Sequence, residues 1–375
     1  MAQKLSNAQI LQRRRRAAIR QANRERRVDA MLVHDPFDIR YLSGLTEGSQ
    51  TLLFGKDWSV LFTGKMFQFC APAECPGTEV VVQNGGADKE IAKTLRKHGA
   101  KKLGFQEDKI SLLRYRSLTE NLNERRLVPT RELIAHLRAV KDDGELRLIR
   151  KAIRIAEGAF RELIGGGAKA IIGKTERQLG AFLENAMRSA GADRHGFQAN
   201  NIIVGSGPNS ANCHHMPTDR KARRGEPVLF DWGAEIDGYR SDITRVAYLD
   251  SAPKRIAEIH PIVLAGQQAA IKAMKPGAKP KSIDKAARGL ITDAGFGEEF
   301  RHGLGHGLGL QIHEHPFMGR ANQKPLRKNM VITVEPGIYF NGFGGVRLED
   351  DIQITAKGRK NLNTLAKKLD EVILQ

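Results

Sequence analysis

The second part of the chain repeats one order of expected elements, in which two helices precede a group of strands. The first copy ends in strand-like segments over 201–249, and the second ends in strand-like segments over 302–355. No residue-by-residue repeat accompanies this order. Two such halves would place their sheets around a shared cleft, so a site at their junction should draw residues from both halves.

The N-terminal part has a different pattern, in which short apolar runs alternate with helical segments. Five runs have the composition of strands: 29–34, 51–55, 58–63, 78–83 and 101–106. This alternation is typical of an α/β domain. A later helical pattern breaks at the Asp-Asp-Gly sequence 142–144, where an aspartate can cap the next helix. We therefore expect one domain over 1–140 and a second domain over 141–375.

Composition restricts the compartment and the kind of metal ligand. The chain has no apolar run that approaches about 18 residues and no apolar segment near its start that resembles a secretory signal. Its three cysteines form no C-x-x-C pair, which fits a reducing compartment and argues against a thiolate zinc site. We expect a cytoplasmic protein with no membrane partner.

The formal net charge of +19 allows a nucleic-acid partner, but such a partner needs a basic patch. The densest basic run is 13–27, in which four residues could form a narrow apolar stripe on a charged helix: Ala17, Ala18, Ile19 and Ala22. We favour a solvated first helix for this run. A polyanion-binding arm and a targeting peptide are the alternatives.

Two aspartates lie inside apolar, β-prone runs of VLFDWGAEIDGYRSDITRVAYL, residues 228–249. A hairpin turn near Asp237 and Gly238 would set Asp231 and Asp242 on one sheet face, directly or diagonally opposed. Two such carboxylates repel each other and resist burial, and a divalent cation would compensate. A surface hairpin with solvated aspartates is the alternative.

The stretch HGLGHGLGLQIHEHP, residues 302–316, contains four histidines among regularly spaced glycines. If extended, it puts His306 on one face with apolar side chains, while the glycines on the other face permit close backbone approach. His306 is then either a ligand or a core histidine with a satisfied partner. His302 and His313 can supply protons or hydrogen bonds nearby, and we assign no role to His315.

Two more acids follow in strand-like segments. Glu335 ends the apolar alternation of VITVEPGIYF before a Pro-Gly turn, and in GGVRLEDDIQIT, residues 344–355, one face carries Arg347, Glu349 and Asp351. Taken singly, Glu335 can be a turn-flanking acid and Glu349 a salt-bridge partner of Arg347. Taken with the two aspartates and one histidine, they match what two divalent cations require.

These motifs resemble those of the aminopeptidase P and prolidase branch of the pita-bread metallopeptidases. The resemblance rests on D-x-G-x(8)-D-I-T-R, HGLGHGLGL, EPGIY and VRLEDDI in this order. It implies an α+β protein, in which a smaller creatinase-type N-terminal α/β domain precedes a pita-bread domain with two pseudo-symmetric halves around a metal cleft. It also implies a homodimer.

The resemblance further implies two metal ions per chain. Asp231 would chelate one ion, His306 and Glu335 the other, and Asp242 and Glu349 would bridge both. Manganese is the implied metal, although Co²⁺, Zn²⁺ and Fe²⁺ suit such ligands as well.

Other residues match positions beside the substrate in this family. His214 matches its proton-shuttle histidine, although the adjacent His215 leaves an ambiguity between the two. His302 and His313 would act as hydrogen-bond and proton partners. Arg347 would position a carboxylate or orient one of the bridging acids, and a structural ion pair is its alternative.

The mechanism follows from such a site, because two metal ions can hold a bridging hydroxide and polarise an amide carbonyl. Glu335 would take the proton of the attacking water, and His214 and His313 would stabilise the tetrahedral intermediate or the departing amine. The implied substrate is a peptide with proline second, so we predict an Xaa-Pro aminopeptidase or Xaa-Pro dipeptidase. A catalytically silent pita-bread protein that binds nucleic acid or protein through its basic surface is the alternative.

Overall fold

The computed structural model describes residues 5–48, 50–122, 126–197 and 202–375. The chain divides into two compact units, Met1–Arg138 and Ala139–Gln375. Each unit has its own hydrophobic core. No helix in the described ranges combines the length and the apolar character that crossing a membrane requires.

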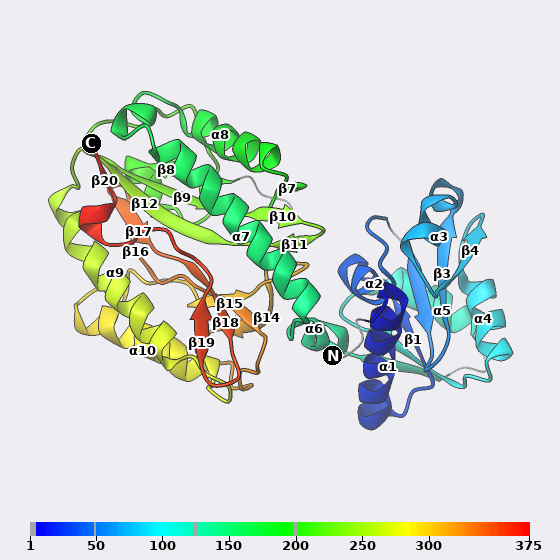
Figure 1. Ribbon diagram of the computed structural model, residues 1–375. Coiled ribbons are helices and arrows are strands. Elements are labelled where there is room, and N and C mark those ends of the chain that lie inside the picture. The colour runs from blue at the N-terminus through cyan, green and yellow to red at the C-terminus, as the bar shows by residue number, and fades with distance from the viewer. Residues whose placement is uncertain (1–4, 49, 123–125, 198–201) are drawn as a thin grey trace. The chain divides into compact units, whose positions relative to one another are not determined.

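The first unit is built on a six-stranded mixed sheet with helices on both faces (Figure 1). In spatial order its strands are β4 (Glu79–Gln83), β3 (Ser59–Gly64), β2 (Thr51–Phe54), β1 (Ala30–Val33), β5 (Lys102–Gln106) and β6 (Arg126–Thr130). Its helices are α1 (Asn7–Arg26), α2 (Pro36–Ser43), α3 (Cys70–Glu74), α4 (Asp88–Lys97), α5 (Leu112–Asn121) and α6 (Leu133–Arg138). The five predicted strands are confirmed, and β6 is an additional strand.

The basic segment 13–27 lies largely on α1, and three of the four predicted stripe residues are buried: Ala18, Ile19 and Ala22. One charged residue departs from the expectation of a solvated face. Arg15 is only 4% exposed, and its Nη1 donates a 2.7 Å hydrogen bond to a backbone oxygen of α2. Burial lowers the pKa of this guanidinium to about 10.

The second unit contains the predicted order of two helices and strands, twice (Figure 1). The first copy has α7 (Asp143–Ile164), α8 (Glu176–Ser189), β7 (Arg194–His195), β8 (Ile203–Ser206), β9 (Pro227–Trp232), β10 (Ala234–Ile236), β11 (Tyr239–Arg240) and β12 (Ile243–Leu249). The second has α9 (Lys254–Ala273), α10 (Pro280–Asp293), β13 (Gly305–Gly307), β14 (Glu314–Met318), β15 (Val331–Val334), β16 (Gly337–Phe340), β17 (Gly344–Arg347), β18 (Asp350–Ile354), β19 (Arg359–Asn361) and β20 (Ile373–Leu374). The main sheets have the orders β20-β12-β9-β8 and β14-β13-β15-β18-β19.

The predicted hairpin is present and sets the two aspartates on one face. Asp237 and Gly238 both have positive φ and form the two-residue turn between β10 and β11. In the register of β9 with β12, Asp231 is opposite Thr244. Asp242 precedes Thr244 by two residues, so it lies on the same face as Asp231 and diagonally opposite to it.

Two predicted strands are shorter than expected. The glycine-rich stretch is extended only over β13, because the chain bends over 309–313 and returns as β14 to pair with it. A Cβ on Gly307 would lie 2.1 Å from the backbone oxygen of His315, so close approach explains this glycine. The segment 344–355 is two strands, because β17 pairs with β16 and β18 pairs with β15. Glu349 therefore lies where the chain passes from one sheet to the next.

Candidate metal centre

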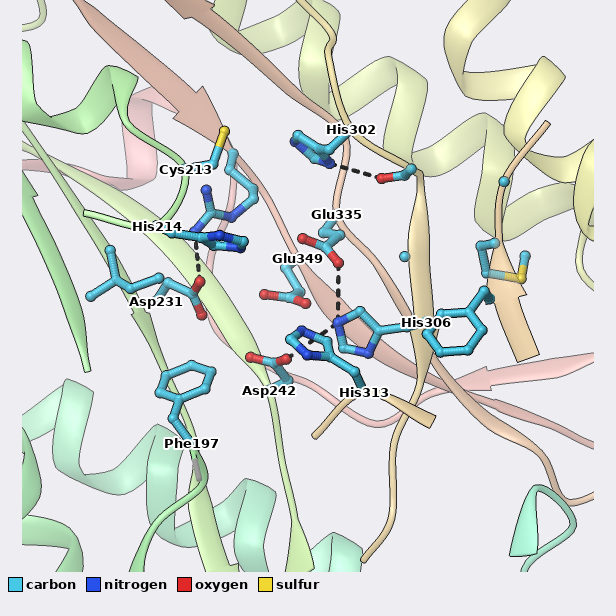
Figure 2. A pocket seen from close by; sticks show the side chains of 17 residues that line it. Phe197, Cys213, His214, Asp231, Asp242, His302, His306, His313, Glu335 and Glu349 are labelled. Atoms are coloured by element: carbon cyan, nitrogen blue, oxygen red, sulfur yellow. Dashed lines mark hydrogen bonds and ion pairs between the residues drawn. The ribbon is translucent and has the colours of Figure 1, made fainter. Parts of the chain in front are cut away.

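A cavity of about 360 Å³ in the second unit brings together all five predicted metal ligands: Asp231, Asp242, His306, Glu335 and Glu349. Figure 2 shows their side chains pointing toward a common centre. Asp231 and Asp242 come from β9 and the residue before β12, in the first half of the unit. The other three come from β13, from the residue after β15 and from the link between β17 and β18, in the second half. The cavity therefore draws on both halves.

His306 lies at the centre of the cluster. Its Nε2 is 3.3 Å from Glu335 Oε1 and 3.6 Å from Asp242 Oδ2. One ligand atom each of Asp242, His306 and Glu349 lies within 4.8 Å of the others. The ring Nδ1 is 3.2 Å from the backbone oxygen of Gly307. A proton on Nδ1 can be donated to that oxygen, which leaves the Nε2 lone pair facing the carboxylates as a metal ligand.

Three carboxylate oxygens in this cluster are buried without a hydrogen-bond donor. Within the described residues, Asp231 Oδ1, Asp242 Oδ1 and Glu349 Oε1 have no partner. An unpaired buried oxygen of an acid is costly to fold, and a divalent cation satisfies it. Carboxylate oxygens with one imidazole are a ligand set that Mn²⁺, Fe²⁺, Co²⁺ and Zn²⁺ accept. The residues present thus fit a divalent metal.

Repulsion between these acids is visible in their ionisation. Burial and the neighbouring carboxylates raise the pKa of Asp242 and of Glu349 well above the ordinary range. Burial also raises the pKa of Asp231, although Arg347 opposes the rise. Glu335 differs, because its hydrogen bond and charge interaction with the imidazole beside it outweigh burial and lower its pKa to about 2.

Arg347 positions Asp231, and none of its hydrogen bonds or ion pairs among the described residues goes to Asp242 or Glu349. Its Nη2 donates to Asp231 Oδ2 at 2.6 Å, and its Nε donates to Thr244 Oγ1 at 3.0 Å. Its Nη1 donates to the Tyr339 hydroxyl at 3.1 Å. The same hydroxyl lies 2.9 Å from His302 Nε2. Tyr339 ends the EPGIY motif, but it was not among the predicted site residues.

The histidines near the cavity separate into different environments. His214 and His313 line the cavity, and burial followed by the charge of His306 lowers the pKa of His313 to about 4. The rings of His306 and His313 meet edge to face with centroids 4.3 Å apart. His215 faces away from the cavity and its Nε2 lies 2.8 Å from Glu176 Oε2. Of the two adjacent histidines, only His214 lines the cavity.

The remaining wall was not predicted. Phe197, Cys213 and Phe317 line the cavity beside the ligands. These side chains carry no motif, and only the folded chain shows that they face the acids. His315 is not among the residues that line the described cavity, and its ring packs edge to face on Phe317 at 5.1 Å.

Comparison with known families agrees with this geometry. The profile of metallopeptidase family M24 matches residues 147–356, and that of the Creatinase/Prolidase N-terminal domain matches residues 15–140. The chain belongs to metallopeptidase family M24. It is therefore a metallopeptidase, and membership implies a divalent metal and peptide substrates.

Solved structures and curated relatives extend the match over most of the chain. An Xaa-Pro dipeptidase from Bacillus anthracis superposes with a TM-score of 0.88 at 33% identity, and the match covers 97% of this chain and 99% of that one. An X-Pro aminopeptidase from Thermotoga maritima gives 0.83 at 34% identity, covering 92% and 98%. The Xaa-Pro dipeptidase of Pyrococcus horikoshii is 34% identical over 347 residues, which are 91% of this chain and 94% of that protein. The predicted family resemblance and fold class are confirmed.

Proposed function

We propose that this metallopeptidase hydrolyses the bond between an N-terminal residue and a following proline, as an Xaa-Pro aminopeptidase or Xaa-Pro dipeptidase. The observation that carries the proposal is the set of buried carboxylate oxygens without donors beside His306. The names of the relatives support proline as the second residue of the substrate. The catalytic domain in this proposal is 141–375.

The proposed ligands hold two divalent ions, with manganese the metal we expect. Asp231 would hold one ion, His306 and Glu335 would hold the other, and Asp242 and Glu349 would serve both. Bound ions of this kind supply an activated water and polarise a carbonyl. The unpaired oxygens of Asp231, Asp242 and Glu349 support this assignment.

The other residues bind the substrate and move protons. Glu335 accepts a proton at its carboxylate and passes it toward the leaving nitrogen. That nitrogen belongs to a tertiary amide without an N–H, and it must gain a proton to depart. His313, with a pKa of about 4, is neutral at pH 7 and donates a hydrogen bond to the substrate oxygen. His214 and His302 are proposed proton and hydrogen-bond partners, and Arg347 holds Asp231.

Peptide hydrolysis after metal exchange tests the proposal. The purified protein is treated with a chelator, returned to Mn²⁺, Co²⁺ or Zn²⁺, and assayed for release of the first residue. The substrates are an Xaa-Pro dipeptide, an Xaa-Pro-Xaa tripeptide and a matched tripeptide with alanine second. We expect metal-dependent cleavage of the proline peptides only. Cleavage of the dipeptide alone marks a dipeptidase, whereas failure to cleave either proline peptide with any metal refutes the proposal.

A further inference from the structure

A buried carboxylate outside the cavity organises the segment that carries His214. Glu176 is the first residue of α8 and is fully buried. Its Oε1 lies 2.8 to 2.9 Å from three donors: Ser206 N, Ser206 Oγ and Asn209 Nδ2. Its Oε2 lies 2.6 to 2.9 Å from three others: Thr218 N, Thr218 Oγ1 and His215 Nε2. Both oxygens therefore have a full set of partners.

The directions of these hydrogen bonds require an ionised acid. The Ser206 hydroxyl accepts a hydrogen bond from Arg220 Nη1 at 2.7 Å, and the Thr218 hydroxyl accepts one from Arg220 N at 3.2 Å. Each hydroxyl is thus free to donate its own proton to Glu176. Burial alone would raise the pKa of Glu176, but the bonds from Thr218, Ser206 and His215 lower it to about 2. An amide in its place has only one acceptor oxygen.

The segment anchored at Ser206 and Thr218 carries Cys213 and His214 to the cavity wall (Figure 2). His214 is exposed and lines the cavity, and none of the hydrogen bonds found among the described residues involves its ring. The ring therefore depends on its backbone for its position. The adjacent His215 is held on the opposite side by Glu176, which fixes that backbone one residue away.

We propose that Glu176 is a positioning residue, which holds the segment 206–218 so that His214 reaches the substrate. This inference rests on the role proposed for His214 in peptide hydrolysis. Glu176 touches neither substrate nor metal, and it acts through the hydrogen bonds at both ends of the segment and at His215. Its position at the N-terminus of α8 also favours the charged form, because the helix dipole stabilises a nearby anion.

The variant Glu176→Gln tests the inference. Its amide NH2 must face one of the two groups of donors that now surround Glu176, and it cannot accept hydrogen bonds from them. We expect kcat to fall roughly tenfold or more, since a small misplacement of a reacting group is costly, while KM changes by less than about twofold. Metal content should not change. The matched control is Glu157→Gln, which alters another buried carboxylate that accepts hydrogen bonds from Thr364 and Leu365, outside the His214 segment. It should leave kcat unchanged.

A double-mutant cycle separates positioning of His214 from a general effect on stability. In a His214→Ala background, Glu176→Gln should cause no further loss of kcat. Hydrogen exchange should also show faster exchange of the amides of Ser206 and Thr218 in Glu176→Gln. If that variant fails to fold, Thr218→Val removes one side-chain donor and should lower kcat roughly fivefold, again only when His214 is present.

The outcomes distinguish this inference from the proposed function. If the unaltered protein cleaves no Xaa-Pro peptide with any metal, both are wrong. If it cleaves such peptides and Glu176→Gln keeps full kcat, the positioning role alone is wrong. The same conclusion follows if the losses from Glu176→Gln and His214→Ala multiply in the double variant.

Discussion

Asp242→Asn should stabilise the metal-free protein while weakening its response to metal. Asp242 is 3% exposed, and its Oδ1 has no hydrogen-bond partner within the described residues. Burial and the charge of Glu349 raise its pKa well above the ordinary range. In the metal-free protein, the carboxylate is therefore either ionised, and repelled by the neighbouring carboxylates, or protonated, although an aspartate in water at neutral pH is ionised. Asparagine keeps the shape and removes the charge.

The expected gain comes from removing a buried charge that the neighbouring carboxylates repel, and leaving such a group uncompensated costs about 1–3 kcal/mol or more. For a domain of this size, each kcal/mol shifts Tm by roughly 2–4 °C, so the metal-free variant should melt about 2–12 °C above the unaltered protein. Bound metal should reduce this difference in stability between the variant and the unaltered protein. An ion at 100 times its Kd stabilises the folded state by about 2.7 kcal/mol, and a variant that lacks a central ligand should lose most of this increment.

Asp350→Asn is the matched control, because it makes the same chemical change at a buried aspartate with different neighbours. Asp350 is fully buried, accepts a hydrogen bond from Arg245 Nη2 at 2.6 Å and pairs with Lys367. These cations lower the pKa of Asp350 despite its burial. Breaking such a pair costs about 3–5 kcal/mol, so this variant should melt lower with or without metal.

Thermal unfolding in a chelator and in excess Mn²⁺ measures both effects. The reasoning requires opposite signs for the two variants in the chelator, and a smaller Mn²⁺-induced rise in Tm for Asp242→Asn. If Asp242→Asn lowers the metal-free Tm as Asp350→Asn does, the argument from repulsion is refuted. An unchanged response to Mn²⁺ would instead refute Asp242 as a ligand.

Two further predictions concern buried charges. The pKa values of Asp242 and Glu349 are raised on folding, so at these two sites the folded metal-free protein binds more protons than the unfolded chain. Between pH 7 and pH 8, above the range in which the buried histidines of lowered pKa titrate, its free energy of unfolding should therefore fall by about 1.4 kcal/mol per pH unit for each proton retained. Urea unfolding in a chelator that shows a rise over this range would contradict this. Lys141 Nζ lies 2.8 Å from Glu314 Oε1, and both side chains are buried. Lys141→Met should lower the free energy of unfolding by about 3–5 kcal/mol, because it leaves Glu314 buried without its partner. The double variant Lys141→Met, Glu314→Leu should lower it by less. Equal losses for the single and the double variant in thermal melts would contradict this.

The features that the sequence predicted correctly depend on near neighbours. The predicted aspartate cap of the second domain's first helix joins residues three apart and is present, with Asp142 and Glu145 as a capping box. The turn at Asp237 and Gly238 determines the register of its hairpin. Because strand side chains alternate, the register then places Asp242 on the face of the earlier aspartate. Local rules were sufficient for these elements.

The features that the sequence did not predict depend on distant partners. Glu176 contacts Ser206, 30 residues away, and Lys141 contacts Glu314, 173 residues away. Charged side chains are usually solvated, so their composition and spacing do not indicate burial. The division of 344–355 into two strands has a similar cause, since β16 and β15 pair with its two parts only in the folded sheet. The periodicity of a segment does not indicate which distant segment it will pair with.

Positive charge is distributed unevenly around the cavity, and this determines whether replacing Asp231 or Asp242 gives the clearer test. One oxygen of Asp231 is paired with the buried guanidinium of Arg347 at 2.6 Å. On the side of His306, the described residues place no lysine or arginine against Asp242 within 4 Å. The uncompensated negative charge therefore lies on the side of His306, where the carboxylates would stabilise a bound cation most. Replacing Asp231 would also leave Arg347 buried without its anion, so its effect on stability would mix two causes. Replacing Asp242 leaves no such cation behind, and its effect reports the repulsion alone.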